Sequence, residues 1–119
     1  MIPKRRVRPK MGVRVSSRIR CTSYLQYVRG RACLAEGPSC FGDPEAHHVR
    51  ENGNAGTGIK PPDSDAVPLC AGHHAELHRV GAKTFESRHG CDLDKQAVAH
   101  WQAWLKTPAG NRFKQESGR

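Results

Sequence analysis

The hydrophobic residues of this chain occur in short groups, and their spacing predicts helices on either side of a small hairpin. Tyr24, Leu25 and Val28 lie on one face of a predicted helix that Ser17 caps and Gly30 ends. A second group near the end of the chain recurs at helical spacing: Ala97, Val98, Trp101, Trp104 and Leu105. We expect both helices to cover a hydrophobic core, although the tryptophans could instead stack on nucleic-acid bases.

Two short strands are predicted between these helices. Residues 46–50 precede an Asn-Gly pair at 52–53, the dipeptide that most strongly indicates a hairpin turn. Residues 66–69 form the returning strand, which Pro68 confines to a sheet edge because proline has no N–H to donate. A helix is then expected over residues 72–79. The order of strand, loop, strand and helix predicts a small α+β fold.

The length and composition of the chain favour one small domain. We place this domain at residues 21–107, between a basic arm at 1–20 and a flexible tail at 108–119. With 36% hydrophobic residues and a mean hydropathy of -0.72, the domain can bury only a modest core. A metal ion that binds only the folded chain would add its binding free energy to folding.

The chain has no apolar segment that would direct it to a membrane. Its longest apolar runs are far shorter than the ~20 residues that a transmembrane helix needs. The beginning of the chain is too charged for the apolar stretch of a signal peptide. We therefore expect a cytoplasmic protein with no membrane contact.

The formal charge of +9 is concentrated in the first twenty residues. This segment has eight basic side chains and no acidic one, whereas the remaining chain has twelve basic and eleven acidic residues. Pro3, Pro9 and Gly12 favour an extended arm that binds the DNA backbone by displacing counterions, and a solubilising tail is the alternative. The candidate phosphate-binding residues of the arm are Lys4, Arg5, Arg6, Arg8 and Lys10.

Four Cys and His residues have the spacing of a structural zinc site. Cys33 and Cys40 flank a Gly-Pro turn, and Cys70 lies three residues before His73, as in the second half of a zinc knuckle. The five cysteines of the chain are an odd number, which argues against a disulfide framework. We predict a Cys3His site for Zn²⁺, with unrelated buried cysteines as the alternative.

The remaining histidines of this region fall into two pairs, His74 with His78 and His47 with His48. His74 and His78 are four residues apart on the predicted helix, so both lie on one face and can bind one ion. His73 is turned by about 100° from His74 and is therefore assigned to the knuckle. His47 and His48 are neighbours on a strand and are expected to point to opposite sides, which favours different roles.

These elements resemble the ββα-metal, or HNH, endonucleases, and most closely the phage and prophage subgroup related to recombination-enhancement nucleases. The resemblance covers roughly residues 24–105. The matching words are Glu45-Ala-His-His-Val-Arg50, Gly56-Thr-Gly-Ile-Lys-Pro-Pro-Asp63, Pro68-Leu-Cys-Ala-Gly-His-His-Ala-Glu-Leu-His78 and Gly81 to Phe85. It implies an α+β, ββα-metal fold with a zinc knuckle, flanking helices and a basic N-terminal arm.

The resemblance also implies roles for the site residues. His48 is similar to the general base that activates water, and His74 and His78 are similar to ligands of one catalytic ion, which could be Zn²⁺, Mn²⁺, Ni²⁺ or Mg²⁺. His47 resembles a further ligand with a catalytic role. The chain lacks the Asn of the HNH name, and this part of the motif offers Asp63 and Asp65 instead. Asp63 matches the Lys-Pro-x-Asp word of the phage subgroup and is expected to take the place of the Asn, with a purely structural role as the alternative.

The resemblance therefore predicts a metal-dependent endonuclease that hydrolyses DNA phosphodiester bonds in a bacterial host cell. It would be encoded by a phage or prophage and act in recombination or DNA processing, with a recombination, packaging or replication protein as partner. Arg50 and Lys60 are candidates for binding the DNA backbone, and solvated surface charge explains them equally well. The alternatives are a non-catalytic zinc module that binds DNA or a recombination partner, and a zinc-stabilised domain that binds only proteins.

Overall fold

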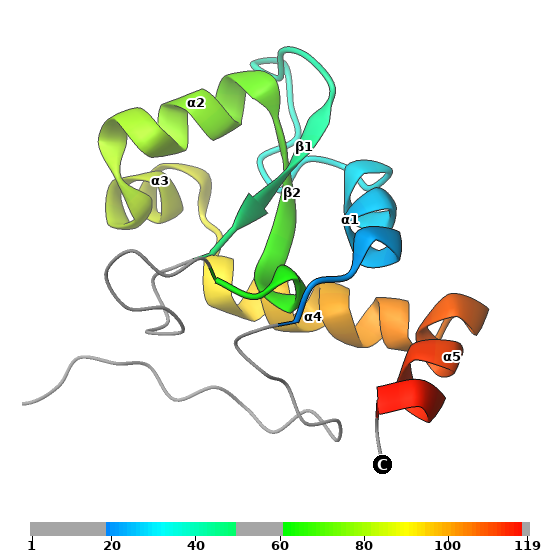
Figure 1. Ribbon diagram of the computed structural model, residues 1–119. Helices are drawn as coiled ribbons and strands as arrows, with labels where there is room; N and C mark the ends of the chain where they lie inside the picture. Colours follow the sequence, from blue (N-terminus) through cyan, green and yellow to red (C-terminus); the bar gives the residue numbers. More distant parts are fainter. Residues whose placement is uncertain (1–18, 50–60, 118–119) are drawn as a thin grey trace, which may run out of the picture.

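The computed structural model describes residues 19–49 and 61–117, and it has the small α+β architecture that the sequence predicts (Figure 1). Its elements are α1 (Thr22–Arg29), β1 (Pro44–His48), the 3-10 helix η1 (Asp63–Asp65), β2 (Ala66–Cys70), α2 (Ala71–Val80), α3 (Ala82–His89), α4 (Leu93–Leu105) and α5 (Pro108–Ser117). None of the described helices is long and apolar enough to cross a membrane. Several predicted features lie outside the described residues, namely the arm up to Arg18, the Asn-Gly turn, Arg50 and Lys60.

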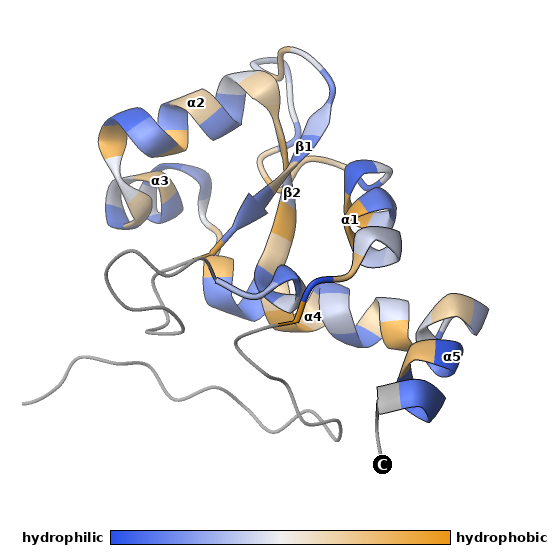
Figure 2. Cartoon of the chain, viewed as in Figure 1, coloured by the Kyte–Doolittle hydropathy of each residue, from blue (hydrophilic) through white to orange (hydrophobic). Residues whose placement is uncertain are grey.

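The two strands form an antiparallel pair that separates the helices. Glu45 lies opposite Leu69, and His47 lies opposite Val67. Because side chains alternate along a strand, Glu45 and His47 face one side of the pair and His48 faces the other. Helices α2 and α3 lie on one side and α1 lies on the other (Figure 1). Strand β2 is buried along its length, and Figure 2 shows it as mostly hydrophobic beside a hydrophilic β1.

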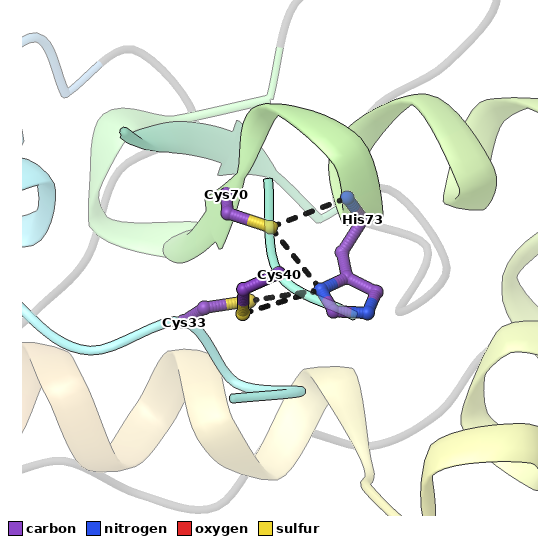
Figure 3. A group of neighbouring side chains, drawn as sticks. All are labelled: Cys33, Cys40, Cys70 and His73. Atoms are coloured by element: carbon purple, nitrogen blue, oxygen red, sulfur yellow. Dashed lines mark hydrogen bonds between the residues drawn. The ribbon is translucent and has the colours of Figure 1, made fainter. Parts of the chain in front are cut away.

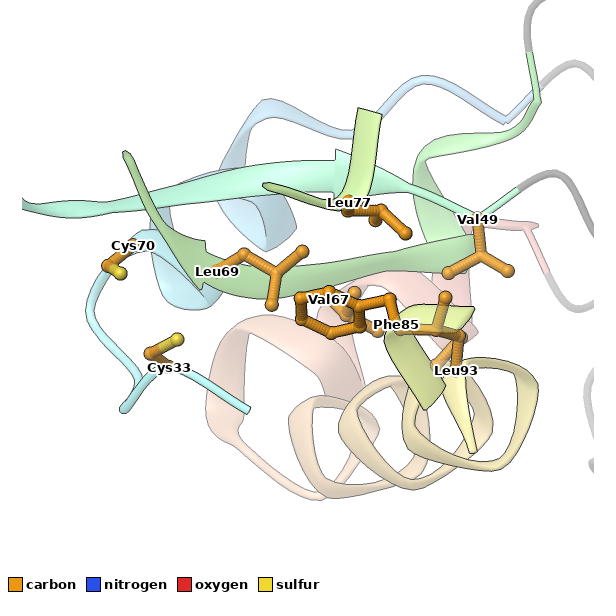
Figure 4. Packing of buried hydrophobic residues seen from close by; sticks show 9 residues of the cluster. Cys33, Val49, Val67, Leu69, Cys70, Leu77, Phe85 and Leu93 are labelled. Atoms are coloured by element: carbon orange, nitrogen blue, oxygen red, sulfur yellow. The ribbon is translucent and has the colours of Figure 1, made fainter. Parts of the chain in front are cut away.

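A hydrophobic cluster packs on each side of this strand pair. The cluster beside α2 and α3 contains Val67, Leu69, Leu77, Phe85 and Leu93 (Figure 4). The cluster beside α1 contains Tyr24, Val28, Ala66, Trp101 and Trp104. Helix α4 supplies residues to both clusters, since Ala97 belongs to the first and Leu105 to the second. The prediction that this last group of apolar residues covers the core is confirmed for Ala97, Trp101, Trp104 and Leu105, whereas Val98 is only half-buried.

Helix α1 begins later than the sequence predicts. Its first residue is Thr22, after Cys21 in an extended conformation, whereas Ser17 lies outside the described residues. The backbone before the helix is held by the buried carboxylate of Asp63, which accepts the Cys21 N–H at 2.7 Å, while Ile19 O accepts the Asp63 N–H at 2.9 Å. These long-range bonds keep the residues before Thr22 from joining the helix. Gly30 ends it, as predicted.

The C-terminal segment differs from the expected flexible tail, because Pro108–Ser117 forms helix α5. Pro108 is the first helical residue, where its missing N–H costs no hydrogen bond. The Phe113 ring packs against Trp101 and Trp104, with centroids 5.4 and 5.7 Å apart. Gly110 permits the close approach, since a Cβ there would collide with the Trp104 carbonyl. A single aromatic residue in a polar segment therefore docks this helix.

Replacing Phe113 by Ala should weaken the packing of α5 on α4. Phe→Ala in a core costs ~3–5 kcal/mol, and because Phe113 is only half-buried we expect a loss of about 1–2 kcal/mol in the free energy of unfolding, measured by urea titration. Gln115→Ala, at an exposed position of the same helix, is the control. Equal stability of the two variants would contradict the packing role.

Candidate metal sites and a histidine–aspartate pair

Three cysteines and one histidine converge at one end of the first hydrophobic cluster. Cys33 and Cys40 come from the loop between α1 and β1, Cys70 ends β2, and His73 lies in the first turn of α2 (Figure 3). The Nδ1 atom of His73 lies 3.5, 3.6 and 3.1 Å from the Sγ atoms of Cys33, Cys40 and Cys70. Tetrahedral zinc with N and S ligands separates these atoms by about 3.6 Å. All four donor atoms lie within 4.8 Å of one another, so the group could hold a metal ion.

The backbone around Cys70 favours a thiolate at this position. Its Sγ accepts the N–H groups of His73 and Phe41, each at 3.4 Å. Burial raises the pKa of Cys70, but these N–H groups, with hydrogen bonds from the Cys40 and His73 side chains, outweigh burial and lower the pKa to about 6. Burial raises the pKa of Cys33 to about 11. Cys70 can thus supply a negative charge at neutral pH, and a bound dication would ionise the other thiols.

Two backbone features hold the halves of the cluster together. Gly42 has φ 82°, and a Cβ there would lie 2.8 Å from the Cβ of Ala71, so only glycine fits without displacing the start of α2. The Gly72 N–H donates to the Phe41 carbonyl at 2.8 Å. On the outer side of the ring, His73 Nε2 lies 3.0 Å from Ser39 Oγ. This contact fixes the ring with Nδ1 towards the sulfur atoms.

A second group of donors lies between β1 and α2. The candidate ligand atoms of His47, His74 and His78 all lie within 4.8 Å of one another, with His47 buried and His78 exposed. The Nε2 atoms of His74 and His78 are 3.2 Å apart, close to the about 3.3 Å between two nitrogen ligands of a tetrahedral ion. Glu45 Oε1 accepts a hydrogen bond from His74 Nδ1 at 2.7 Å. Three nitrogen donors on two elements could thus hold one ion.

His48, the next residue along β1, contacts a different element. Its Nε2 lies 2.8 Å from Oδ1 of Asp63, whose other oxygen accepts the Cys21 N–H. Asp63 is almost fully buried, and His48 is 19% exposed at its side chain. The two neighbouring histidines therefore serve opposite faces of the strand, as the alternation predicts. Asp65 is also buried, and its backbone carbonyl accepts the Val49 N–H at 3.0 Å.

A third cluster joins α2 to α3. Glu76 binds Arg88 Nη1 at 2.8 Å and His89 Nε2 at 2.9 Å, and these hydrogen bonds lower its pKa. His73 and His89 pack with ring centroids 5.0 Å apart, and the ligand atoms of His73, Glu76 and His89 lie close enough to surround an ion. His73 already directs Nδ1 at three sulfur atoms, and the positive charge of Arg88 neutralises the negative charge of Glu76. The contacts are better explained as a hydrogen-bonded junction that packs α3 against α2 beside His73.

The sequence reasoning missed the carboxylate of Glu45 beside the second histidine group. Glu45 and His47 are two residues apart on one strand, and this period-2 spacing is the signal that could have placed Glu45 on the same face. His89 and Glu76 carried no such signal, since their contact depends on how α3 turns back after Gly81. Of the other predicted site residues, the five arm residues, Arg50 and Lys60 lie outside the described part of the chain.

The chain belongs to the family described as "Protein of unknown function (DUF968)", which matches residues 7–105. It is similar to "Putative nuclease YbcO" of Escherichia coli (strain K12), with 44% identity over 56 residues, or 44% of this chain and 58% of that protein. "Putative nuclease ybcO" of Enterobacteria phage 82 has the same identity and coverage. "Uncharacterized protein YdfU" of Escherichia coli (strain K12) is 34% identical over 73 residues, which are 60% of this chain and 19% of YdfU.

The chain thus matches little more than half the length of the YbcO proteins and about a fifth of YdfU. No solved structure matches the chain.

Replacing Cys40 by Ser should remove one tightly bound metal ion per chain, because the Cys3His group then has three strong donors. Loss of a structural metal is among the most destabilising changes, so we expect a loss of at least about 4 kcal/mol in the free energy of unfolding. Elemental analysis and urea unfolding measure the two effects. Cys91→Ser, which alters a half-buried thiol outside the group, is the control. Unchanged metal content in Cys40→Ser would contradict the site.

Proposed function

We propose that this chain is a metal-dependent endonuclease of the ββα-metal (HNH) type that hydrolyses DNA phosphodiester bonds. The observation that carries the proposal is that two neighbouring histidines of β1 have different partners. His47 lies beside His74 and His78, while His48 is hydrogen-bonded to Asp63. The nuclease description of the YbcO relatives supports it. The relative from Enterobacteria phage 82 supports an origin in a phage or prophage. The role that we propose is in DNA recombination or processing.

His48 is the proposed general base. Its Nε2–H donates to the buried Asp63 carboxylate, which leaves the lone pair of Nδ1 free to accept a proton from water. The carboxylate is fixed by the Cys21 N–H on its other oxygen, so it holds the imidazole in one tautomer and orientation. Asp63 would therefore act as a positioning residue, in the place of the Asn of the family name. The water oxygen would attack phosphorus as its proton passes to Nδ1, and the bond between phosphorus and the departing 3′ oxygen would break.

His47, His74 and His78 are the proposed ligands of the catalytic ion. Three imidazoles leave a tetrahedral ion one position for a phosphate oxygen. When bound, a divalent ion would polarise the scissile phosphate and stabilise negative charge on the departing oxygen. Nitrogen ligands favour Zn²⁺, Mn²⁺ or Ni²⁺ over Mg²⁺, which prefers oxygen. His47, a proposed metal ligand, and His48, the proposed base, are consecutive residues at the end of β1. Since consecutive Cα atoms are about 3.8 Å apart, the strand keeps the proposed ion and the proposed base close together.

The Cys3His group is proposed to bind a structural Zn²⁺. Cys33, Cys70 and His73 are buried beside the hydrophobic cluster, Cys40 is half-buried, and four donors would leave no position for a substrate. The Zn²⁺ ion would stabilise a domain whose apolar core is small, in the same way as a further layer of core residues would. The proposed DNA-binding residues are those of the basic arm with Arg50 and Lys60, and a phage recombination, packaging or replication protein is the proposed protein partner.

A non-catalytic, zinc-stabilised DNA-binding module is the second candidate. The observations that favour it are the concentration of positive charge in residues 1–20 and the more complete burial of the Cys3His group. Such a module would bind DNA and hold zinc at the knuckle without cleaving the backbone.

Replacing His48 by Ala should abolish metal-dependent cleavage of plasmid DNA. Loss of a general base lowers the rate by about 10²- to 10⁴-fold, while metal content and the circular dichroism spectrum should stay unchanged. His100→Ala is the control, since His100 lies on α4 and its Nδ1 donates to the Gln96 carbonyl of its own helix. Equal cleavage by His48→Ala and wild type would refute His48 as the base. Absence of cleavage by wild type with any of the four metals would favour the second candidate.

Deleting residues 1–18 should weaken DNA binding and its salt dependence together. The segment has seven basic residues, and each phosphate contact adds about 0.9 to the slope of log affinity against log salt, so the slope should fall by at most ~6. Fluorescence anisotropy with a labelled duplex measures this slope between low and physiological salt. The folded part of the chain should keep its unfolding midpoint. An unchanged slope would show that the segment is only a solubilising tail.

A further inference from the structure

We propose that Glu45 is a positioning residue that fixes the tautomer and orientation of His74 and thereby sets the metal affinity of the histidine group. This inference rests on the proposed function, because it assigns a role towards the ion of that group. Its starting point is the 2.7 Å contact between Glu45 Oε1 and His74 Nδ1.

The contact decides which nitrogen of His74 can bind a metal. A carboxylate only accepts hydrogen bonds, so His74 Nδ1 carries the proton and the lone pair lies on Nε2. Nε2 is the atom that lies 3.2 Å from His78 Nε2 inside the histidine group. Metal-binding imidazoles commonly donate their second N–H to a carboxylate in this way, which orients the ring and makes the ligand nitrogen more basic. The observed pairing is therefore the one that favours an ion at Nε2.

The fold makes this pairing specific to Glu45. Glu45 and His47 lie two residues apart on β1 and face α2 together, opposite Leu69 and Val67. One strand thus supplies a ligand of the group and the carboxylate that braces another ligand on the facing helix. His47 packs against His74 with ring centroids 5.2 Å apart, so both strand residues contact the same ring.

The other histidine–carboxylate pairs of the described residues serve different places. Asp63 holds His48 on the opposite face of the strand, and Glu76 joins α2 to α3 through Arg88 and His89. Three neutral imidazoles bring no negative charge to a dication. The Glu45 carboxylate would bring one negative charge near the ion, because it is hydrogen-bonded to His74. Its side chain is 51% exposed, so solvent screens the charge and the hydrogen bond carries more of the effect.

The alternative explanation is a surface ion pair between Glu45 and a protonated His74, which would have no bearing on metal affinity. The two explanations differ in the state of the ring. A brace predicts that His74 is neutral, with its proton on Nδ1, and that zinc binds Nε2. Long-range ¹H–¹⁵N correlation spectra of the zinc-loaded protein report this tautomer directly.

The experiment uses the full chain with one Zn²⁺ bound at the Cys3His group, called the first ion. A second equivalent of Zn²⁺, which would bind the histidine group, is titrated in competition with a chromophoric chelator. Glu45→Ala should lower the affinity for the second ion by about 10- to 100-fold and leave the first ion bound. Glu45→Gln should fall between Glu45→Ala and wild type, because its amide oxygen still accepts from Nδ1 without the charge. Asp43→Ala removes an equal charge from an exposed side chain of the adjoining segment and should bind the second ion as wild type does.

The outcomes separate this inference from the proposed function. If wild type binds the second ion and Glu45→Ala binds it equally well, Glu45 has no positioning role and the histidine site stands. If Asp43→Ala weakens binding as much as Glu45→Ala, the effect is charge alone and the positioning role is wrong. If wild type binds only one ion, the proposed catalytic site fails and the role of Glu45 fails with it. Retention of the first ion in both Glu45 variants shows that they are folded.

Discussion

The alternation of side chains along β1 is the constraint on which the candidate site depends. Glu45 and His47 face α2, and His48 faces the loop that contains Asp63. A shift of one residue in the pairing of β1 with β2 would exchange these faces and separate both histidines from their partners. The burial of Val67 and Leu69 under α2 and α3 fixes the register. Packing of the small core thus specifies which histidine of β1 joins His74 and His78.

A metal ion in the Cys3His group would help so small a core to hold this register. Cys33 and Cys70 lie at one end of the cluster that contains Leu69 and Phe85 (Figure 4). An ion there would tie the loop before β1 to the end of β2 and the start of α2, which are the elements that present the histidines. The hydrogen bonds of Glu76 with Arg88 and His89 join α3 to α2, the helix that presents His73, His74 and His78. Stability and site geometry therefore share the same contacts.

Local patterns predicted most of the elements and failed where long-range contacts decide the conformation. The periodicity of Trp101 and Leu105 predicted α4, because an amphipathic pattern depends only on neighbouring residues. The start of α1 depends on Asp63, which is forty-two residues away from Cys21. Helix α5 depends on the docking of Phe113 against Trp101 and Trp104, and its polar composition hides this contact.

The sequence by itself determined the inventory of donors and their local geometry. The spacing of Cys70 and His73, and of His74 and His78, follows from helix geometry, and the opposite faces of His47 and His48 follow from the pleat. Only the tertiary structure decided which partner each donor meets: Glu45 at His74, Asp63 at His48, and Glu76 at His89. Each pair joins two elements, and the distance between these elements depends on how the whole core packs. The spacing of residues along a helix or strand contains no information on that distance.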